Sequence, residues 1–474
     1  MELPVGEIAG ILGAKDGLGP GTARGYSIDS RSIRPGDLFF AIRGPRFDGH
    51  DYVAQVLEKG AVAAVVGDGF KPGNPAWPLI HVTDPAEALQ RLASVVRQRW
   101  AGPLIGVTGS SGKTTTKEMI AAILGRRFSV LKSESNFNNQ YGVPLTLLRL
   151  APEHEIAVLE MAMSAAGEIA LLASIARPQT GVVTNVTAAH LAFFDSVDSI
   201  ARAKRELVEH LASPATAVLN HDDDRVLRFQ EGFSGRVATY GFSEGSDFRA
   251  IRLRTAASAA DAATTAEFEV EGPGIGGWFS IPLPGRHNVE NALAAIATGS
   301  VFGVGLEDSR AALASLRLPG MRSEVLKLAR NITLINDSYN SNPRAMERMI
   351  ETLAAWPGAR RRIVVAGEML ELGPSSPELH KGVGRECAIS EIDWVIAVQG
   401  DASFILDGAR QAGMPEDHLR FFSSAKEAGQ FCSTLLSGGD VILLKGSRGV
   451  RLENALAVIE KALGSPGRAE DPLS

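Results

Sequence analysis

A run of seven residues, Thr108-Gly109-Ser110-Ser111-Gly112-Lys113-Thr114, has the composition of a phosphate-binding loop. It lies between a short apolar run, typical of a strand, and a helical pattern. Glycines let the backbone wrap closely around phosphate oxygens, with successive N–H groups pointing inward. A lysine in this place reaches the β- and γ-phosphates, and the hydroxyl after it can bind Mg²⁺. The run therefore predicts a nucleotide site, in which we expect Lys113 to be solvated before a ligand binds.

The spacing of this loop is a variant of a common one. The pattern G-x-x-x-x-G-K-[ST] requires glycine at position 107, where the chain has Val107. A chance glycine turn is the alternative interpretation, and the strand before the loop and the helix after it argue against that. The loop indicates nucleotide binding and leaves the reaction open.

Two residues with metal-binding chemistry follow later apolar runs. Glu160 ends the run 156–160, and a carboxylate there suits Mg²⁺, which prefers hard oxygen ligands. A salt bridge at the strand end is the alternative. His190 follows the run 180–186 after a short turn. A lone histidine is more often structural, but a place after the carboxyl end of a strand favours a function.

A lysine lies on the apolar face of a helix predicted over residues 196–211. At about 100° per residue, the apolar side chains of this segment share one face. They are Val197, Ile200, Leu207, Val208 and Leu211. Lys204 projects to the middle of that face, where an ammonium is costly unless it is paired, deprotonated or modified. The alternative is a lysine whose ammonium reaches the edge of the face and the solvent.

The composition is that of a globular protein with several domains. The chain has 474 residues, of which 45% are hydrophobic and 22% charged, enough for about two to four domains. With 48 Lys and Arg against 54 Asp and Glu, its net charge of −6 argues against a general nucleic-acid binder. Cys387 and Cys432 are too few for a disulfide framework or a zinc cluster. We see no secretory signal and no apolar run of the ~20 residues that a membrane span needs, so we expect a cytoplasmic protein.

The elements around these residues predict an α/β fold of three domains. We expect a small N-terminal α/β domain over 1–102, a central P-loop ATPase domain with a mostly parallel sheet over 103–318, and a C-terminal doubly wound (Rossmann-like) domain over 319–474. Four β-rich runs, each followed by a helical pattern, predict the parallel sheet of the last domain: NITLIND, RRIVVAGE, DWVIAVQG and DVILLKGS. In the central domain the alternating runs 267–272 and 278–285 predict antiparallel strands, followed by a helix from about Asn288 to Gly303.

Eight motifs follow one another along the chain: TGSSGKT, ESNFNNQYGVPLTLL, EMAMSAAGEI, the span from AHLAFFDS to AKRELV, GRHNVENALAA, NDSYNSNP, GEMLELG and KGSRGVRLE. With these motifs the chain resembles the Mur ligases from end to end. Within the family, the chain resembles the branch that adds a D-alanyl-D-alanine dipeptide. The segments that carry this likeness are DSRSIRPGDLFFAIRGPRFDGHDY, DSYNSNP and GEMLELG. Other Mur ligases and folylpolyglutamate synthases share the phosphate loop but are not similar at those segments.

The resemblance implies an ATP-dependent amide-bond ligase of peptidoglycan precursor synthesis, which serves the cell wall, cell shape and cell division. ATP, with Mg²⁺, would phosphorylate the terminal carboxylate of UDP-N-acetylmuramoyl-tripeptide, and the amine of D-alanyl-D-alanine would then displace phosphate. Such phosphoryl transfer depends mainly on alignment and charge neutralisation. The first domain would hold UDP, the second the ATP phosphates and metal, and the third would close over the nucleotide and help bind the dipeptide. We expect a monomer.

The resemblance also assigns site residues by their places in the motifs. The expected catalytic residues are Lys113, His190 and Lys204. Mg²⁺ is expected on Thr114 and Glu160, and His190 with a carbamylated Lys204 would support a second ion. The expected ATP contacts are Thr108, Gly109, Ser110, Ser111, Gly112, Lys113, Thr114, Thr115, Asn288, Asn291, Arg322 and Asp337. The expected substrate contacts are Ser30, Arg31, Asn138 and Asn139.

Alternatives to single assignments and to the whole function stay open on the sequence. Asn288 and Asn291 share a helix face, and Asn288 could also cap that helix. Another Mur ligase or a folylpolyglutamate-synthase-like amide ligase is a second enzyme hypothesis. A nucleotide-gated binding protein, in which the loop is a switch, is a hypothesis from another class. ADP release separates them, because a ligase needs both its acid and its amine.

Overall fold

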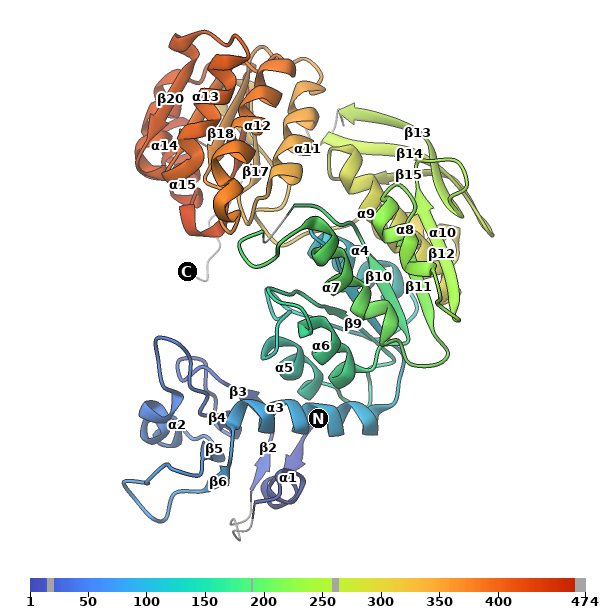
Figure 1. Cartoon of the computed structure of the whole chain (residues 1–474), viewed down its shortest axis with the longest axis vertical. Coiled ribbons are helices and arrows are strands. Elements are labelled where there is room, and N and C mark those ends of the chain that lie inside the picture. The colour runs from blue at the N-terminus through green and yellow to red at the C-terminus, as the bar shows by residue number, and fades with distance from the viewer. Residues whose placement is uncertain (15–20, 189–190, 258–263, 465–474) are drawn as a thin grey trace.

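Three α/β domains follow one another along the chain in the computed structural model (Figure 1). The structure describes residues 1–14, 21–188, 191–257 and 264–464. We call the domains N-terminal, central and C-terminal, after the four-, nine- and six-stranded sheets around which they are built. In Figure 1 they lie at the bottom, at the right and at the top left. The fold class predicted from the sequence is confirmed.

The N-terminal domain has short strands and three helices among the described residues. They are β1 (Leu3–Pro4), α1 (Val5–Leu12), β2 (Thr22–Ala23), β3 (Gly25–Ser27), β4 (Asp37–Phe40), α2 (Val53–Glu58), β5 (Ala63–Gly67), β6 (Leu79–Val82) and α3 (Pro85–Trp100). The sheet β3-β4-β5-β6 is parallel, and β1 and β2 form a separate antiparallel pair. Asp84 caps α3 by accepting from the Ala86 amide, and Pro85 takes the first helical position.

The central domain alternates strands and helices and then changes to antiparallel strands. Its strands are β7 (Leu104–Thr108), β8 (Val130–Lys132), β9 (Ile156–Glu160), β10 (Thr180–Val183), β11 (Thr216–Asn220), β12 (Arg236–Gly241), β13 (Phe248–Ala257), β14 (Thr264–Gly272) and β15 (Ile275–Ile281). Its helices are α4 (Lys113–Leu124), α5 (Gly142–Leu148), α6 (Glu168–Ala176), α7 (Val197–Glu209), α8 (Asp224–Leu227), α9 (Arg286–Val301) and α10 (Leu306–Ala314).

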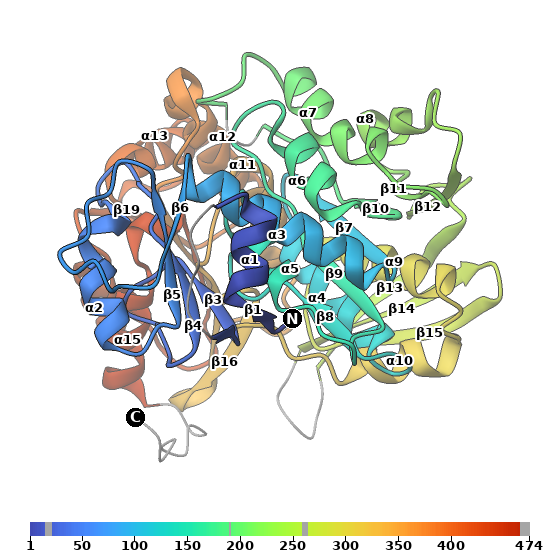
Figure 2. The same cartoon turned by 90° about the horizontal axis from the view of Figure 1, so that it is seen from below.

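One sheet in the order β15-β14-β13-β12-β11-β10-β7-β9-β8 joins these central strands. From β8 to β13 neighbouring strands are parallel, whereas β13, β14 and β15 are antiparallel, as the sequence predicts. Helix α3 of the preceding domain contacts α5 and α6, as Figures 1 and 2 show. Apolar residues of both domains form one continuous core there, so the N-terminal domain is anchored on the central one.

The C-terminal domain is a doubly wound sheet between helices. Its elements are β16 (Glu324–Leu328), β17 (Ile332–Asp337), α11 (Pro343–Ala354), β18 (Arg362–Gly367), α12 (Ser376–Ile389), β19 (Trp394–Val398), α13 (Ser403–Gln411), β20 (Leu419–Phe422), α14 (Ala425–Leu435), β21 (Val441–Lys445) and α15 (Glu453–Leu463). The strand order is β16-β17-β21-β18-β19-β20, with β16 antiparallel and the others parallel. The four predicted strands are confirmed, and β20 and the edge strand β16 are additions to the prediction.

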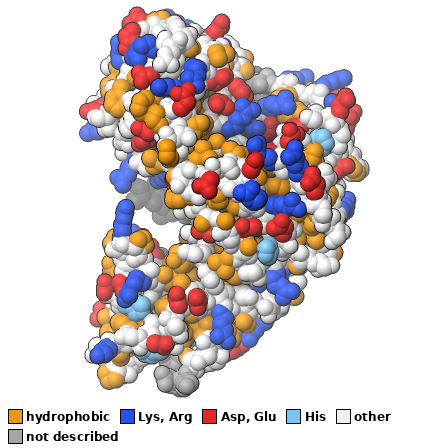
Figure 3. All heavy atoms as spheres, viewed as in Figure 1, with side chains coloured by type: hydrophobic (Ala, Val, Ile, Leu, Met, Phe, Trp, Pro, Cys, Tyr) orange, Lys and Arg blue, Asp and Glu red, His pale blue; other side chains and the backbone are white. Residues whose placement is uncertain are grey.

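The carboxyl ends of parallel strands from two domains border one cleft. Residues after β7, β9 and β10 of the central domain line it on one side, and residues after β17, β18 and β21 of the C-terminal domain line it on the other. This is the edge at which open α/β sheets bind ligands. On the face seen in Figure 3, side chains of both charges are interspersed. Within the described part of the chain, no helix combines the length and apolarity that crossing a membrane requires.

Candidate active site

The predicted phosphate loop joins β7 to α4 and depends on glycine at two positions. Gly109 has φ +151°, and a Cβ there would lie 1.8 Å from the Thr184 hydroxyl oxygen. Gly112 precedes α4 with φ +79°, and its Cβ would lie 2.3 Å from the Asn291 Oδ1. The loop therefore lies too close to its neighbours for larger residues. It leads into the N-terminus of α4, where free N–H groups favour a bound anion.

Residues after β10 hold this loop in shape. The Asn185 carbonyl oxygen accepts from the Ser110 amide at 2.9 Å, and its side-chain Oδ1 accepts from the Ser111 amide at 3.0 Å. The Thr184 hydroxyl donates to the Ser111 carbonyl oxygen at 2.6 Å. Asn185 was not among the predicted site residues. Its only signal in the sequence is its place near the end of the predicted run 180–186.

The expectation that Lys113 is solvated is wrong. Its side chain is partly buried, and its ammonium donates to the Gly109 carbonyl oxygen at 2.9 Å. Burial lowers the pKa of Lys113, the charge of Glu160 opposes that shift, and the charge of Arg322 adds to it. The ammonium thus lies inside the loop, where its hydrogen-bond acceptor is the Gly109 carbonyl oxygen.

Glu160 and Thr114 form a pair of oxygen donors beside the loop. The Thr114 hydroxyl donates to Oε2 of Glu160 at 2.7 Å, and Asn138 donates from its amide to Oε1 at 2.8 Å. Glu160 and Thr114 are both buried. A hydroxyl and a carboxylate at hydrogen-bond distance, next to a phosphate loop, are the hard ligands that Mg²⁺ prefers. The donor set therefore fits Mg²⁺.

The burial predicted for Lys204 is confirmed. Lys204 lies on α7, which begins at a capping box of Ser196 and Ser199. Only 2% of the surface of Lys204 is exposed. Burial lowers the pKa of Lys204 strongly, and the charge of Lys113 lowers it further. No carboxylate of the described residues forms an ion pair with its ammonium. A lowered pKa favours the neutral amine, which is the form that can react with carbon dioxide.

His190, the predicted partner of Lys204 in a second metal site, lies outside the described residues. In the described ranges, no group of three or more His, Cys, Asp and Glu side chains could hold a metal ion. Of the metal ligands predicted as Thr114, Glu160, His190 and carbamylated Lys204, the structure shows Thr114 and Glu160 in hydrogen-bond contact.

The first turn of α9 forms another part of the cleft wall. Asn291 donates to Oδ1 of Asn288 at 3.5 Å, so the two amides lie together as predicted. Oδ1 of Asn291 also accepts from the hydroxyl of Thr116, one turn into α4, at 3.2 Å. The alternative that Asn288 caps the helix is wrong, because Gly285 occupies the cap and the Asn288 amide donates to the Pro284 carbonyl at 2.7 Å.

The C-terminal domain contributes a buried ion pair and an arginine. Asp337, at the end of β17, accepts from the Lys445 ammonium at 2.5 Å and from the Ser323 amide at 2.9 Å. Desolvation opposes ionisation of Asp337, but Lys445 lowers the net pKa of its carboxyl. The Arg322 guanidinium lies 3.9 Å from the centroid of the Tyr339 ring. Lys445 ends β21 in one of the four repeated runs, and it was not selected from the sequence.

Together these residues line a cleft of about 530 Å³. The predicted residues that line it are Ser110, Ser111, Gly112, Lys113, Thr114, Thr115, Asn138, Glu160, Asn288, Asn291, Arg322 and Asp337. Thr108, Gly109 and Asn139 are not among the lining residues. Thr108 ends β7, and Asn139 accepts from the Tyr141 and Gly142 amides at the start of α5. Ser30 and Arg31 lie apart from the cleft, in the N-terminal domain, where Arg31 pairs with Asp29 at 2.7 Å.

Two further side chains of the cleft were missed from the sequence. His287 lies one residue before Asn288, and burial lowers its pKa to about 4, so that its ring is neutral at pH 7. The Nδ1 atom of His287 has no hydrogen-bond partner among the described residues. Arg348 reaches the cleft from α11. His287 adjoins a predicted residue, whereas nothing in the sequence indicated that Arg348 would reach this edge.

A phosphate loop, an adjoining hydroxyl–carboxylate pair and a cleft between two α/β domains define a nucleotide-binding enzyme of the P-loop class. Family models agree with this: "Mur ligase family, catalytic domain" matches residues 22–97, "Mur ligase middle domain" residues 107–299, and "Mur ligase, glutamate ligase domain" residues 321–448. The chain belongs to the Mur ligase family.

Curated relatives match over nearly the whole chain. The Bacillus subtilis protein named UDP-N-acetylmuramoyl-tripeptide–D-alanyl-D-alanine ligase is 38% identical over 93% of both chains, and the Escherichia coli protein of the same name is 36% identical over 93% of this chain and 94% of that one. Among solved structures, MurF from Acinetobacter baumannii has a TM-score of 0.87 and 31% identity, covering 97% of this chain and 99% of its own. MurF ligase from Thermotoga maritima in complex with ADP has a TM-score of 0.80 and 31% identity, covering 93% and 98%.

Proposed function

We propose that the protein is an ATP-dependent ligase that joins D-alanyl-D-alanine to UDP-N-acetylmuramoyl-tripeptide in peptidoglycan precursor synthesis. The supporting observation is the cleft, in which the phosphate loop and the Thr114–Glu160 pair face the Asp337–Lys445 pair. The names of the relatives supply both substrates. A structure titled as the complex of a similar ligase with ADP supports the nucleotide.

The cleft suits phosphoryl transfer to a carboxylate. The loop amides and the Lys113 ammonium would hold the ATP phosphates and offset the charge that develops on the transferring group. The tripeptide carboxylate attacks the γ-phosphorus, which forms an acyl phosphate and releases ADP. The amine of the dipeptide then attacks the acyl carbon, forms the amide and releases phosphate. Arg322 and Asp337, which come from the other domain, would bind the nucleotide from the opposite side.

Mg²⁺ would bind at the Thr114 hydroxyl and the Glu160 carboxylate, where it offsets negative charge on the phosphate oxygens. Asn138 orients that carboxylate through its hydrogen bond to Oε1. We also propose that Lys204 is carbamylated, because it is buried and has a lowered pKa, and no carboxylate of the described chain pairs with it. The carbamate would give an anionic oxygen donor toward the metal, with His190 as its partner.

We propose three domain roles with the boundaries predicted above. Residues 1–102 would hold the UDP part of the substrate through Ser30 and Arg31, residues 103–318 the ATP, and residues 319–474 the dipeptide. Asn138 and Asn139 would line the muramoyl tripeptide. A cytoplasmic location suits Cys387 and Cys432, which are both buried free thiols. We expect a monomer.

ADP release from the purified enzyme tests this function. We expect release only when ATP, Mg²⁺, a UDP-muramoyl tripeptide and D-alanyl-D-alanine are all present. The tripeptide is supplied with either lysine or diaminopimelate as its third residue, and the amine is varied over D-alanine, L-alanine, D-glutamate and L-alanyl-L-alanine. Preference for another amine, or for a folate, would assign the protein to another ligase. Slow hydrolysis that is indifferent to acid and amine would indicate a nucleotide switch.

A further inference from the structure

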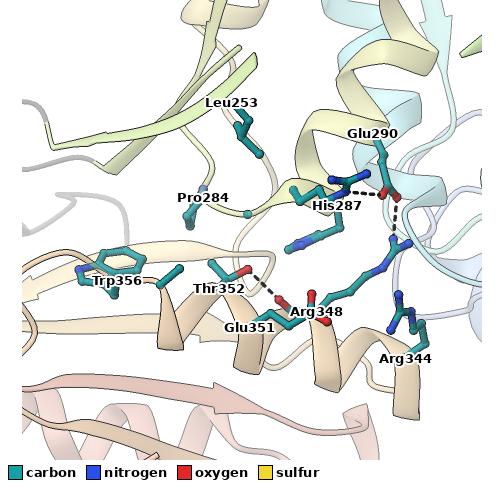
Figure 4. A pocket seen from close by; sticks show the side chains of 12 residues that line it. Leu253, Pro284, His287, Glu290, Arg344, Arg348, Glu351, Thr352 and Trp356 are labelled. Atoms are coloured by element: carbon teal, nitrogen blue, oxygen red, sulfur yellow. Dashed lines mark hydrogen bonds and ion pairs between the residues drawn. The ribbon is translucent and has the colours of Figure 1, made fainter. Parts of the chain in front are cut away.

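A buried ion pair joins the central and C-terminal domains at the edge of the nucleotide cleft, which Arg348 lines. Glu290 lies on α9 and Arg348 on α11, and Nη1 of Arg348 lies 2.8 Å from Oε2 of Glu290. Their side chains are 9% and 19% exposed. Figure 4 shows the two side chains directed toward each other at the wall of a small pocket. The pair therefore crosses the boundary between the domains and is largely removed from solvent.

The two helices that carry this pair also carry opposite walls of the cleft. On α9, Asn288 and Asn291 line the cleft. Asn288 lies two residues before Glu290, and Asn291 lies one residue after it. On α11, Ala345 and Met349 line the cleft beside Arg348. Glu290 is not itself among the residues that line the cleft. A shift of α11 along α9 would therefore change the width of the cleft without changing any residue in it.

A second contact shows that the two helices meet at a defined place. A Cβ on Gly285, the residue that caps α9, would lie 2.6 Å from the Thr352 hydroxyl oxygen on α11. Thr352 lies one turn beyond Arg348. The backbone of one helix start thus lies directly against the other helix, and the Glu290–Arg348 pair lies beside this close approach.

The pair depends on the arrangement of the domains seen here. Burial raises the pKa of Glu290, and the charge of Arg348 is the largest factor that opposes the shift. Arg286 is a weaker partner, 3.8 Å away and with a 57% exposed side chain. A buried charge without a partner strongly destabilises the fold. Glu290 and Arg348 must therefore either pair with each other or be hydrated. Separating the domains would hydrate both, whereas this arrangement pairs them.

We infer that Glu290 and Arg348 are positioning residues, whose ion pair sets the relative placement of α9 and α11 and thereby the affinity of the cleft for ATP. The inference rests on the proposed function only in taking ATP as the occupant of the cleft. It assigns no contact between Glu290 and substrate. Its consequence is that the affinity for nucleotide depends on a residue outside the cleft.

A double-mutant cycle with Glu290→Gln, Arg348→Met and the double variant tests this inference. The dissociation constant of a non-hydrolysable ATP analogue with Mg²⁺ is measured by calorimetry, together with kcat and the KM for ATP. For Glu290→Gln we expect the dissociation constant and the KM to rise about tenfold, with kcat within about threefold of the parent. The double variant should bind the analogue no more weakly than Arg348→Met. Either single substitution already breaks the ion pair, so the second one removes no further interaction of the pair.

Arg385→Met is the matched control. It removes an ion pair with Glu378, at 2.9 Å, that lies within the C-terminal domain, and it should leave analogue binding unchanged. Thermal melting of each variant shows that it is folded. Unchanged analogue binding in folded Glu290→Gln, or losses that simply add in the double variant, would overturn the inference. Failure of the parent protein to bind the analogue would instead overturn the proposed function, so the two failures are distinguishable.

Discussion

Lys113 in the phosphate loop and Lys204 near it differ in their electrostatic surroundings. Burial lowers the pKa of both lysines, but the charge of Glu160 opposes that shift at Lys113, whereas the charge of Lys113 adds to it at Lys204. An ammonium inside the loop is useful for binding phosphates. A second ammonium nearby would repel a metal ion, and this is one reason why we propose that Lys204 is carbamylated. The two residues therefore give separate predictions.

Lys113→Ala should abolish turnover in a folded protein. Loss of the ammonium removes stabilisation of the transferring phosphoryl group and should lower kcat on the order of 10²-fold or more. The melting temperature should change little, because the Lys113 side chain makes one hydrogen bond to the described residues, to the Gly109 carbonyl oxygen. Steady-state kinetics and a thermal melt check both. Activity near that of the parent would refute the assignment of the loop.

Lys204→Ala and Lys204→Arg should both be nearly inactive. Arginine keeps the positive charge but cannot form a carbamate, whereas alanine leaves space in which a small carboxylic acid could supply the missing oxygen donors. Activity of the alanine variant should therefore be partly restored by acetate or formate. Because the carbamate forms only from the neutral amine, activity of the parent should fall as pH falls, and added bicarbonate should offset part of that loss. Full activity of the arginine variant would contradict the carbamate.

The sequence could identify site residues that stand in local patterns, and not those defined by distant partners. The phosphate loop, Glu160 and the buried Lys204 each have a signature within about fifteen residues. Asn185 and Lys445 do not, because their partners, Ser111 and Asp337, lie 74 and 108 residues away in the chain. Which strands adjoin in a sheet decides such contacts, and no local pattern shows this.

The start of α4 should be sensitive to any side chain at position 112. Gly112→Ala would place a non-glycine residue at φ +79° and a methyl group against Asn291. Gly167→Ala has a similar φ, +85°, but nothing lies within 4 Å of the added Cβ. Each should lose about 1–2 kcal/mol of stability through backbone strain. Only Gly112→Ala should also bind an ATP analogue more weakly.

Melting temperature and analogue affinity, measured on both glycine variants, check this. A matched loss of stability with an affinity loss confined to Gly112→Ala is the expected result. If both variants bind the analogue as the parent does, the loop and Asn291 are not as tightly packed as the structure indicates.

Elements with strong patterns were predictable, and elements defined by their neighbours were not. Helix α3 is predictable in this way, because a cap, a proline and regular apolar spacing mark it. The four apolar runs of the last domain form parallel strands, as predicted, because each is a β-rich run followed by a helical pattern. The edge strand β16 was missed, since its residues are only partly buried and no apolar run marks it. Its pairing with β17 is a tertiary contact.

At the scale of the whole molecule, the proposed nucleotide contacts come from two domains. Lys113 and Asn291 belong to the central domain, whereas Arg322 and Asp337 lie beyond it in the chain. Neither set encloses the cleft alone, so ATP and substrate should favour the arrangement in which the domains are closest. Small-angle X-ray scattering should show a smaller radius of gyration with an ATP analogue and UDP-muramoyl tripeptide than without ligands.

Lys113→Ala is the control for this closure, because it should bind the analogue poorly and compact less. An unchanged radius of gyration in the parent enzyme, under conditions where calorimetry shows both ligands bound, would count against domain closure. The shared core of α3 with α5 and α6 should keep the N-terminal domain attached in either state.

The fate of the carboxylate oxygen tests the proposed reaction most directly. UDP-muramoyl tripeptide, labelled with ¹⁸O in its terminal carboxylate, is turned over with ATP and D-alanyl-D-alanine, and the released phosphate and the product are weighed by mass spectrometry. An acyl phosphate requires that one carboxylate oxygen leave with the phosphate while the other stays in the new amide. We therefore predict one ¹⁸O atom in each phosphate and one in the product, whose mass exceeds that of the labelled tripeptide by one dipeptide less one ¹⁸O-labelled water. Phosphate without label, released alongside unchanged tripeptide, would contradict the ligase mechanism.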